Sequence, residues 1–489
     1  MIKEWIGADR SPTPTRTGAG GATTLKRVTT VAAAAIASTL LAASAAEAAS
    51  WIRITSEPQP QNTSEVGLER TADGVLHVLW PRDSGASEQV MHSAIAVNGK
   101  TVSGPNQVAS TPSSINPSVD LVAGPGGGLR AFFTGVFPGV LNDAMRTATA
   151  GGAGTVWSAH AAASELSGST NASAGAGIGA VDNGGVPWST WGDSSPGGGG
   201  LHAGVSPADP DLGFSPSCCE RDPNLAADGA SGVVAVGWNR LGPGASSLQV
   251  LVPFISPIED APSSGAVWLQ QRIGLTGRIG AGGIYAAYGS GSNQFNARPA
   301  LWRIGSSGAN VVKTRRDAEH TTLAPAPGGR LWVAWEGKDR GNRIFATRTN
   351  PAATRFGAIV ATKPPPGTDA IHRLNVEGSR GPLDVVALAD RGGGDIAHWT
   401  ARLRPGLTLA AKPKKVAAGK KVTFTVSDAG MPVQGAKVEL SLGGKQPAKQ
   451  TNAKGKAKIK VPGSTKPGRY EAIAGKGGYE SAQLKIRVK

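Results

Sequence analysis

The sequence predicts an all-β protein that consists of an N-terminal β-propeller and a C-terminal β-sandwich. The first observation behind this prediction is a strand unit that recurs about every fifty residues, the spacing of a four-stranded propeller blade. The second is a series of short strands with alternating apolar residues near the C-terminus. The third is charge, because residues 49–405 hold 27 basic and 27 acidic residues, whereas residues 406–489 hold 18 and 4. We therefore expect these two ranges to be separate domains.

The recurring unit is a glycine turn followed by an apolar strand that ends, in most copies, in an aromatic residue. A second strand follows beyond a polar turn, which makes each unit a β-hairpin. Successive copies end 47 to 58 residues apart, and their number predicts about seven blades. The copies are Gly74–Trp80, Gly127–Phe133, Gly185–Trp191, Gly232–Trp238, Gly282–Tyr288, Gly329–Trp335 and a degenerate seventh, Gly381–Ala387.

The aromatic residues that end these strands are expected to pack between neighbouring blades. A strand between two blades buries apolar side chains on both faces, and one buried aromatic side chain removes ~150 to 250 Å² from water. Stacking against a sugar is the alternative role for them. The residues are Trp80, Phe133, Trp191, Trp238, Tyr288 and Trp335.

A propeller needs its first and last blades joined, because an open ring leaves an unpaired sheet edge. Residues 51–54, Trp-Ile-Arg-Ile, form a short apolar strand without a hairpin partner of its own. We predict that this strand pairs with residues 396–403 and completes the last blade.

The repeat resembles the secreted sialidase-like and BNR-type propellers over residues 51–404. That resemblance implies a blade architecture and, as an alternative function, a sialidase-like carbohydrate-active enzyme. The Ser-x-Asp-x-Gly-x-Thr-Trp boxes of that family are absent from the sequence. A sialidase also needs a tyrosine paired with a glutamate, and the two tyrosines of the propeller, Tyr285 and Tyr288, both fall on the predicted core strand. The sequence therefore predicts no catalytic residue.

The C-terminal range alternates apolar and polar residues in short runs separated by turns, which is typical of a sandwich. Three of its segments resemble the T(D/N)AxGxA, GxY and GGY signatures of bacterial immunoglobulin-like modules on exported proteins: Thr451–Ala457, Gly468–Tyr470 and Gly477–Tyr479. The resemblance implies an immunoglobulin-like domain with a spacer or adhesion role. Tyr470 is expected at a turn like the tyrosine corner, where it stabilises the fold.

Lysines recur at alternate positions in this basic domain, at Lys454, Lys456, Lys458 and Lys460. A two-residue period places such side chains on one face of a strand. A lysine face on an exported protein suits a polyanion such as an envelope polymer, an acidic polysaccharide or anionic lipid head groups. A merely solubilising surface is the alternative. Nucleic acid is disfavoured, because exposed aromatic residues are not interleaved with the lysines.

The N-terminal segment has the pattern of a secretory signal. Lys26 and Arg27 precede an alanine-rich apolar run, and Ala46-Glu47-Ala48 follows as a small-x-small cleavage site. We expect residues 1–48 to be removed on export and the protein to be secreted or attached to the cell surface. A retained membrane anchor is the alternative, although alanine is only weakly apolar.

The two cysteines of the chain, Cys218 and Cys219, are adjacent. They can form a strained vicinal disulfide, which we favour, pair with another chain or remain thiols. No metal site is predicted around them, since zinc ligands must be spaced to surround the ion. The sequence also lacks the HExxH, GxSxG and phosphate-loop motifs, so we expect no cofactor.

Taken together, these features favour an exported, non-catalytic binding protein. The propeller would recognise a ligand or a protein partner at its mouth, and the basic domain would attach the protein to an anionic envelope polymer or polysaccharide. The alternative is a carbohydrate-active enzyme, a sialidase-like glycoside hydrolase or lyase, that uses the propeller mouth.

Overall fold

The computed structural model is all-β in the part of the chain that it describes, apart from a three-residue 3₁₀ turn at Pro125–Gly127 and one 3₁₀ residue at Asn296. The predicted signal segment, residues 1–48, lies outside that part. No helix long and apolar enough to cross a membrane occurs among the described residues. Those residues are 50–56, 58–59, 66–85, 87–111, 115–135, 144–165, 174–193, 201–204, 220–242, 245–253, 255, 257–265, 272–291, 296–314, 318–337, 342–444 and 446–489.

The described residues up to position 403 form seven small antiparallel sheets, each built almost wholly from strands consecutive in sequence. The first four contain β2 (Gly67–Arg70), β3 (Leu76–Asp83), β4 (Glu88–Ile95) and β5 (Thr101–Thr111); β6 (Ile115–Ala123), β7 (Leu129–Gly135), β8 (Ala144–Ala150) and β9 (Ala161–Glu165); β10 (Ala174–Val181), β11 (Pro187–Asp193) and β12 (Leu201–Gly204); and β13 (Glu220–Ala227), β14 (Val234–Gly242), β15 (Ala245–Leu251) and β16 (Glu259–Asp260).

Three further sheets complete this region. They contain β17 (Gly274–Gly277), β18 (Ile284–Ser290), β19 (Arg298–Arg303) and β20 (Ala309–Val311); β21 (Ala318–Ala326), β22 (Arg330–Gly337), β23 (Arg343–Arg348) and β24 (Val360–Thr362); and β25 (Ala370–Glu377), β26 (Leu383–Asp390), β27 (Ile396–Leu403) and β1 (Ile52–Arg53).

Each recurring unit found in the sequence falls on the second strand of a different sheet. These strands are β3, β7, β11, β14, β18, β22 and β26. The glycines that precede them supply backbone angles that other residues rarely adopt, as at Gly74 (φ 86°) and Gly329 (φ 72°). The glycine turn and the apolar run therefore set the hairpin locally, as the sequence predicts.

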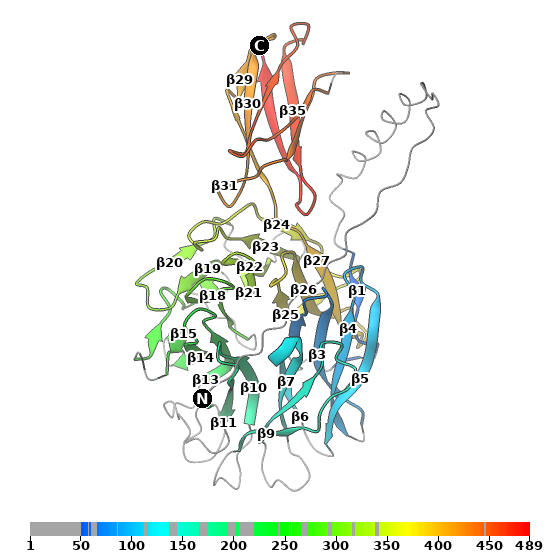
Figure 1. Ribbon diagram of the computed structural model, residues 1–489, viewed down its shortest axis with the longest axis vertical. Helices are drawn as coiled ribbons and strands as arrows, with labels where there is room; N and C mark the ends of the chain where they lie inside the picture. Colours follow the sequence, from blue (N-terminus) through cyan, green and yellow to red (C-terminus); the bar gives the residue numbers. More distant parts are fainter. Residues whose placement is uncertain are drawn as a thin grey trace, which may run out of the picture. The chain divides into compact units, whose positions relative to one another are not determined.

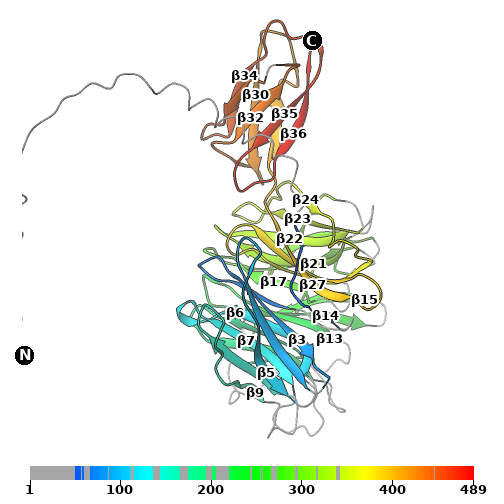
Figure 2. The same cartoon turned by 90° about the vertical axis from the view of Figure 1, so that its right-hand side faces the viewer.

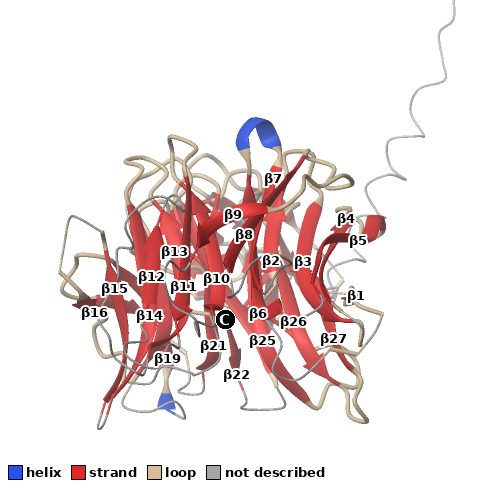
Figure 3. Cartoon of the chain, turned by 90° about the horizontal axis from the view of Figure 1, so that it is seen from below, coloured by secondary structure: helices blue, strands red, loops and turns tan. Residues whose placement is uncertain are grey.

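The first strand of each sheet contacts the first strand of the next, and the series closes on itself. In order, the contacts join β2, β6, β10, β13, β17, β21 and β25, and β25 then contacts β2. Figures 1 and 3 show these sheets arranged about a common axis. We call these seven strands the inner strands. Their closed order produces a propeller-like fold.

The N-terminal strand β1 closes this series, as the sequence predicts. Ile52 lies opposite Thr400, and Arg53 lies opposite Trp399 of β27. The backbone N–H of Ile54 donates to the carbonyl oxygen of His398 at 2.8 Å. The strand therefore becomes the outermost strand of the last sheet.

The C-terminal residues form two sheets around one apolar core (Figure 2). One sheet contains β28 (Thr408–Lys412), β30 (Lys421–Asp428), β31 (Met431–Pro432) and β34 (Lys456–Lys460). The other contains β29 (Lys415–Val416), β32 (Lys437–Ser441), β33 (Ala448–Gln450), β35 (Gly468–Gly475) and β36 (Ala482–Val488). Phe424 and Val438, one from each sheet, are fully buried in that core.

Candidate functional site

A register shift recurs near the start of the inner strands. It occurs in β6, β10, β13, β21 and β25, where extra residues stand opposite the second strand of the same sheet. Such bulges redirect side chains and are common at the rims of closed sheets and next to active sites. The bulged starts of the inner strands are therefore where unusual side-chain arrangements are expected.

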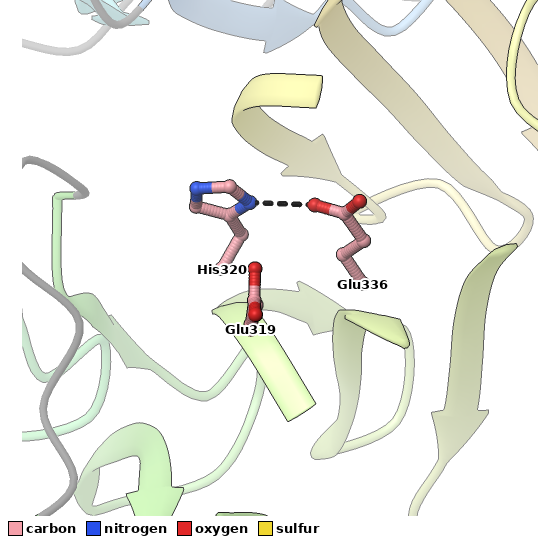
Figure 4. A group of neighbouring side chains, drawn as sticks. All are labelled: Glu319, His320 and Glu336. Atoms are coloured by element: carbon pink, nitrogen blue, oxygen red, sulfur yellow. Dashed lines mark hydrogen bonds and ion pairs between the residues drawn. The ribbon is translucent and has the colours of Figure 1, made fainter. Parts of the chain in front are cut away.

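The bulge of β21 brings together Glu319, His320 and Glu336 (Figure 4). Glu319 lies opposite Glu336 of β22, and the register shifts between Glu319 and Thr322. His320 has a φ of 45°, and its Nδ1 is 2.8 Å from Oε2 of Glu336. The ligating atoms of the three side chains all lie within 4.8 Å of one another, and the three residues are 5%, 4% and 1% exposed. The cluster is compact, polar and closed to solvent.

The next inner strand repeats this arrangement in a more open form. The bulge of β25 contains His372, whose Nε2 is 3.4 Å from Oδ2 of Asp390 at the end of β26. Both side chains are half-buried. The guanidinium of Arg373 donates to the carbonyl oxygen of His372 at 2.7 Å. A histidine beside a carboxylate is the pair that general acid–base chemistry uses.

An ion pair joins the inner strand β6 to the residue segment just before β17, an inner strand that is not its neighbour in the ring. Arg272, which precedes β17, donates from Nη1 to Oδ1 of Asp120 on β6 at 3.1 Å and from Nη2 to the carbonyl oxygen of Val119 at 2.8 Å. The backbone N–H of Gly179 on β10 donates to Oδ2 of Asp120 at 3.2 Å. Strands β6 and β10 and the segment before β17 therefore meet at this carboxylate.

Carboxyl groups on the inner strands have raised pKa values. Burial, with the nearby charge of Glu377, raises the pKa of Glu69 to about 8, and burial raises that of Glu377 to about 6. Burial also raises the pKa of Asp120, against the opposing effect of Arg272. Strongly shifted groups gather at functional sites and also in structural ion networks, so geometry must decide between the two.

The predicted packing residues lie on the second strands of their sheets. Trp80, Phe133, Trp238, Tyr288 and Trp335 are all buried in the described apolar clusters. Trp191 lies on β11, and its side chain falls outside the described residues. Cys218 and Cys219 also lie outside them, so the disulfide stays a prediction.

Three of the four predicted lysines lie on the outer face of the sheet formed by β28, β30 and β34, and the fourth lies in the turn before β34. Lys454 precedes β34, and Lys456, Lys458 and Lys460 alternate along it with the buried Ala457 and Ile459. All four lysines are exposed.

Two lysines from other strands join this face. Lys460 lies opposite Lys421 of β30, while Lys458 lies opposite Thr423, which in turn lies opposite Lys412 of β28. None of the outward positions of β28, β30 and β34 is an aspartate or glutamate. We call the six lysines the lysine face: Lys412, Lys421, Lys454, Lys456, Lys458 and Lys460.

Neither of the two histidine–carboxylate groups is among the residues predicted from the sequence. Glu319 and His320 are adjacent in the sequence, and side chains at adjacent strand positions ordinarily point to opposite faces. A regular strand pattern therefore gives no reason to place both beside Glu336. The available signal was the recurrence of a histidine at the start of two consecutive repeats, at His320 and His372.

No protein-family model matches the sequence, and no curated protein matches it. Solved structures with a similar fold include a PL25 ulvan lyase, with 8% identity, a TM-score of 0.43 and coverage of 71% of this chain and 96% of that chain. The polysaccharide lyase Uly1 has 11% identity, a TM-score of 0.41 and coverage of 72% and 93%. An α-L-arabinanase of Penicillium chrysogenum has 11% identity, a TM-score of 0.36 and coverage of 72% and 96%.

These neighbours are β-rich, propeller-like proteins named for their action on polysaccharides. At such identities and TM-scores the likeness is one of fold, and it assigns neither a reaction nor a substrate to this chain.

Proposed function

We propose that this protein is exported and binds an anionic polysaccharide or envelope polymer through the lysine face. In this proposal residues 1–48 are a signal peptide, residues 49–405 a seven-bladed propeller of the sialidase-like type, and residues 406–489 an immunoglobulin-like domain. The closed order of the inner strands and the pairing of β1 support the propeller. Support for the immunoglobulin-like domain comes from two sheets around one core and from Tyr470, whose hydroxyl donates to the carbonyl oxygen of Lys466 at 2.8 Å.

The lysine face is the observation that carries the binding proposal. Lys421 and Lys460 lie directly opposite each other, and like charges in that position destabilise a sheet. Lysines two positions apart on β34 stand roughly 7 Å from each other, since a strand rises ~3.4 Å per residue. A linear polyanion lying along the strands would meet several of these charges at once and would relieve their repulsion.

The opposite sheet provides the contrast that makes this face distinctive. Its outer positions mix charges. Arg469 lies opposite Arg487, but Lys485 lies opposite Glu471. Nζ of Lys437 is 2.6 Å from Oε1 of Glu439. If the lysines served only to keep the protein soluble, they could be spread equally over the outer faces of both sheets. The lysine face instead carries six lysines, and none of the outward positions on its strands is a carboxylate.

Retention of the full chain on anionic polymers tests the proposal. We expect the protein to bind isolated envelope material and acidic polysaccharides, with binding that weakens steeply as salt rises from about 0.05 to about 0.5 M. Over that range the Debye length contracts from about 14 to about 4 Å. Replacing Lys454, Lys456, Lys458 and Lys460 by Gln should abolish most of this retention.

The matched control removes the same charge from the other sheet and its flanks. Lys449, Lys476, Lys485 and Lys489 are exposed and lie outside the lysine face. Replacing all four by Gln should leave most of the retention intact. Equal loss in both variants would show that only net charge matters, and the proposed binding face would then be rejected.

A second candidate function is a carbohydrate-active enzyme, and the pair of His372 and Asp390 favours it. The carboxylate orients the imidazole, which could accept a proton from a sugar, while Arg373 lies next in the chain and could bind a uronate. The half-burial of this pair leaves it more accessible than the Glu319 cluster.

Incubation of the full chain with neutral and acidic polysaccharides, followed by assays for new reducing ends and unsaturated uronates, tests this candidate. Activity that is lost in His372→Ala would establish an enzyme with this residue at its site. Binding of a polysaccharide without cleavage of the polysaccharide would reject this candidate and support the non-catalytic binding function.

A further inference from the structure

We propose that Glu319, His320 and Glu336 form a binding site for one divalent transition-metal ion. This inference is independent of the lysine face and of the His372 pair. The site lies at the bulge of β21, where the three buried side chains meet.

The backbone of β21 is shaped so that two adjacent residues reach the same partner. In a regular strand, Glu319 and His320 would point to opposite faces. The bulge after Glu319 and the φ of 45° at His320 turn the imidazole toward Glu336 instead. Such a backbone angle is uncommon for a residue with a side chain, so the surrounding sheet must hold it in place.

Glu336 provides the observation that points to a bound cation. Its Oε2 lies 2.8 Å from Nδ1 of His320, whereas its Oε1 is buried and has no hydrogen-bond partner in the described part of the chain. A buried carboxylate oxygen without a partner is costly, and buried charges are usually paired or coordinate a metal. A cation between the three side chains would satisfy this oxygen.

Charge and spacing fit a divalent ion. The two carboxylates carry two negative charges in a site that is almost fully buried, and one divalent ion neutralises both. Zinc binds histidine nitrogen and carboxylate oxygen at ~2.0 to 2.2 Å, which places neighbouring ligands of a tetrahedral site roughly 3.4 Å apart. Ligating atoms within 4.8 Å of one another can reach that spacing through small rotations of the side chains.

The ligand types select the class of metal. Imidazole favours Zn²⁺ and other late first-row ions, whereas Ca²⁺ takes oxygen ligands, six to eight of them. Three protein ligands leave one position of a tetrahedral site for water. We therefore expect Zn²⁺ to bind and Ca²⁺ not to compete with it. The competing explanation is a hydrogen bond between His320 and Glu336 without any metal.

The experiment measures metal content and metal-dependent stability of the full chain. After treatment with a chelator and dialysis against Zn²⁺, we expect one zinc ion per chain by elemental analysis and a higher melting temperature than that of the chelated protein. Ca²⁺ should not restore the melting temperature. If the chelated wild-type protein takes up no zinc, or takes it up without any change in melting, the proposal is wrong.

Substitutions locate the ion. Glu336→Gln and His320→Gln should each weaken zinc binding at least about tenfold, the range known for changes around a metal. The matched control is His372→Gln, a histidine beside a carboxylate in the equivalent bulge of the next sheet, which should keep full zinc content. Circular dichroism identifies any variant that fails to fold, and the wild-type titration still decides the matter in that case. Equal zinc content in His320→Gln and wild type would overturn the assignment.

Discussion

Ile52 and Thr400 lie opposite each other in an antiparallel pair, although they stand near the two ends of the propeller-like region. The pairing is reinforced on both sides, because Nε1 of Trp51 donates to the carbonyl oxygen of Lys363 at 2.8 Å and Nη2 of Arg53 lies 2.8 Å from Oδ1 of Asp395. One short segment that precedes the first sheet in sequence therefore belongs to the last sheet.

Deleting residues 51–56 should lower the melting temperature by roughly 5 °C or more, because the last sheet loses its outer strand and several hydrogen bonds. Differential scanning calorimetry measures this shift. A chain in which a Gly-Ser linker of equal length replaces these residues serves as control and should melt as low as the deletion. An unchanged melt in either variant would remove the closure argument.

A buried ion pair forms a second connection between the first and last sheets. Nη2 of Arg70 on β2 lies 2.6 Å from Oδ2 of Asp384 on β26, and both side chains are buried. Removing one partner of such a pair leaves a buried charge and costs about 3–5 kcal/mol.

Arg70→Met should therefore destabilise the protein by about 3–5 kcal/mol, as measured by denaturant unfolding. The double variant Arg70→Met with Asp384→Leu should recover most of that loss, because neither charge remains. A double variant that is as unstable as the sum of the two single variants would mean that the ion pair does not couple the sheets.

Two histidines pack against each other, and we expect them to lower the unfolding free energy of the protein in acid. Nδ1 of His77 lies 3.0 Å from Nε2 of His92, and burial lowers the pKa values of the two groups to about 4 and about 3. The unfolded chain takes up protons near pH 6.5, whereas the folded chain does not. The stability from these neutral histidines is therefore present above about pH 6.5 and is lost as the pH falls toward 4, at about 1.4 kcal/mol per pH unit for each group.

The raised carboxyl pKa values of Glu69 and Glu377 act with the opposite sign, so a comparison of variants is needed. The unfolding free energy of the wild type should fall relative to that of His77→Gln with His92→Gln as the pH is lowered from about 7 to about 5. Parallel pH curves for the two proteins would show that these histidines do not titrate differently on unfolding.

The lysine face should weaken the fold that carries it. Because Lys421 and Lys460 lie directly opposite each other, Lys460→Gln should raise the stability at low salt by about 0.2–1 kcal/mol while it weakens retention on polyanions. The gain should vanish at high salt, where screening removes the repulsion. Chemical denaturation at two salt concentrations measures it. A loss of stability at low salt would indicate that the lysine has a structural role instead.

Much of the fold could be predicted because its signals are local. A glycine with positive φ followed by an apolar strand specifies a hairpin wherever it occurs, so the second strands of all seven sheets were visible from residues such as Gly74 and Trp80. The lysine face was visible for the same reason, since a two-residue period fixes which side chains share a face of β34. The need to join the first and last blades likewise predicts the pairing of the strand at Ile52.

The sequence by itself therefore determined the strand units, the division of charge and the exposed row of lysines. Only the tertiary structure decided that Glu319, His320 and Glu336 meet, because a bulge overrides the alternation that the sequence pattern implies. It alone also decided that Arg272 reaches Asp120, since that contact depends on how many sheets separate β6 from β17 around the ring. Local periodicity fixes which face a side chain occupies, whereas long-range register and ring closure fix what it meets there.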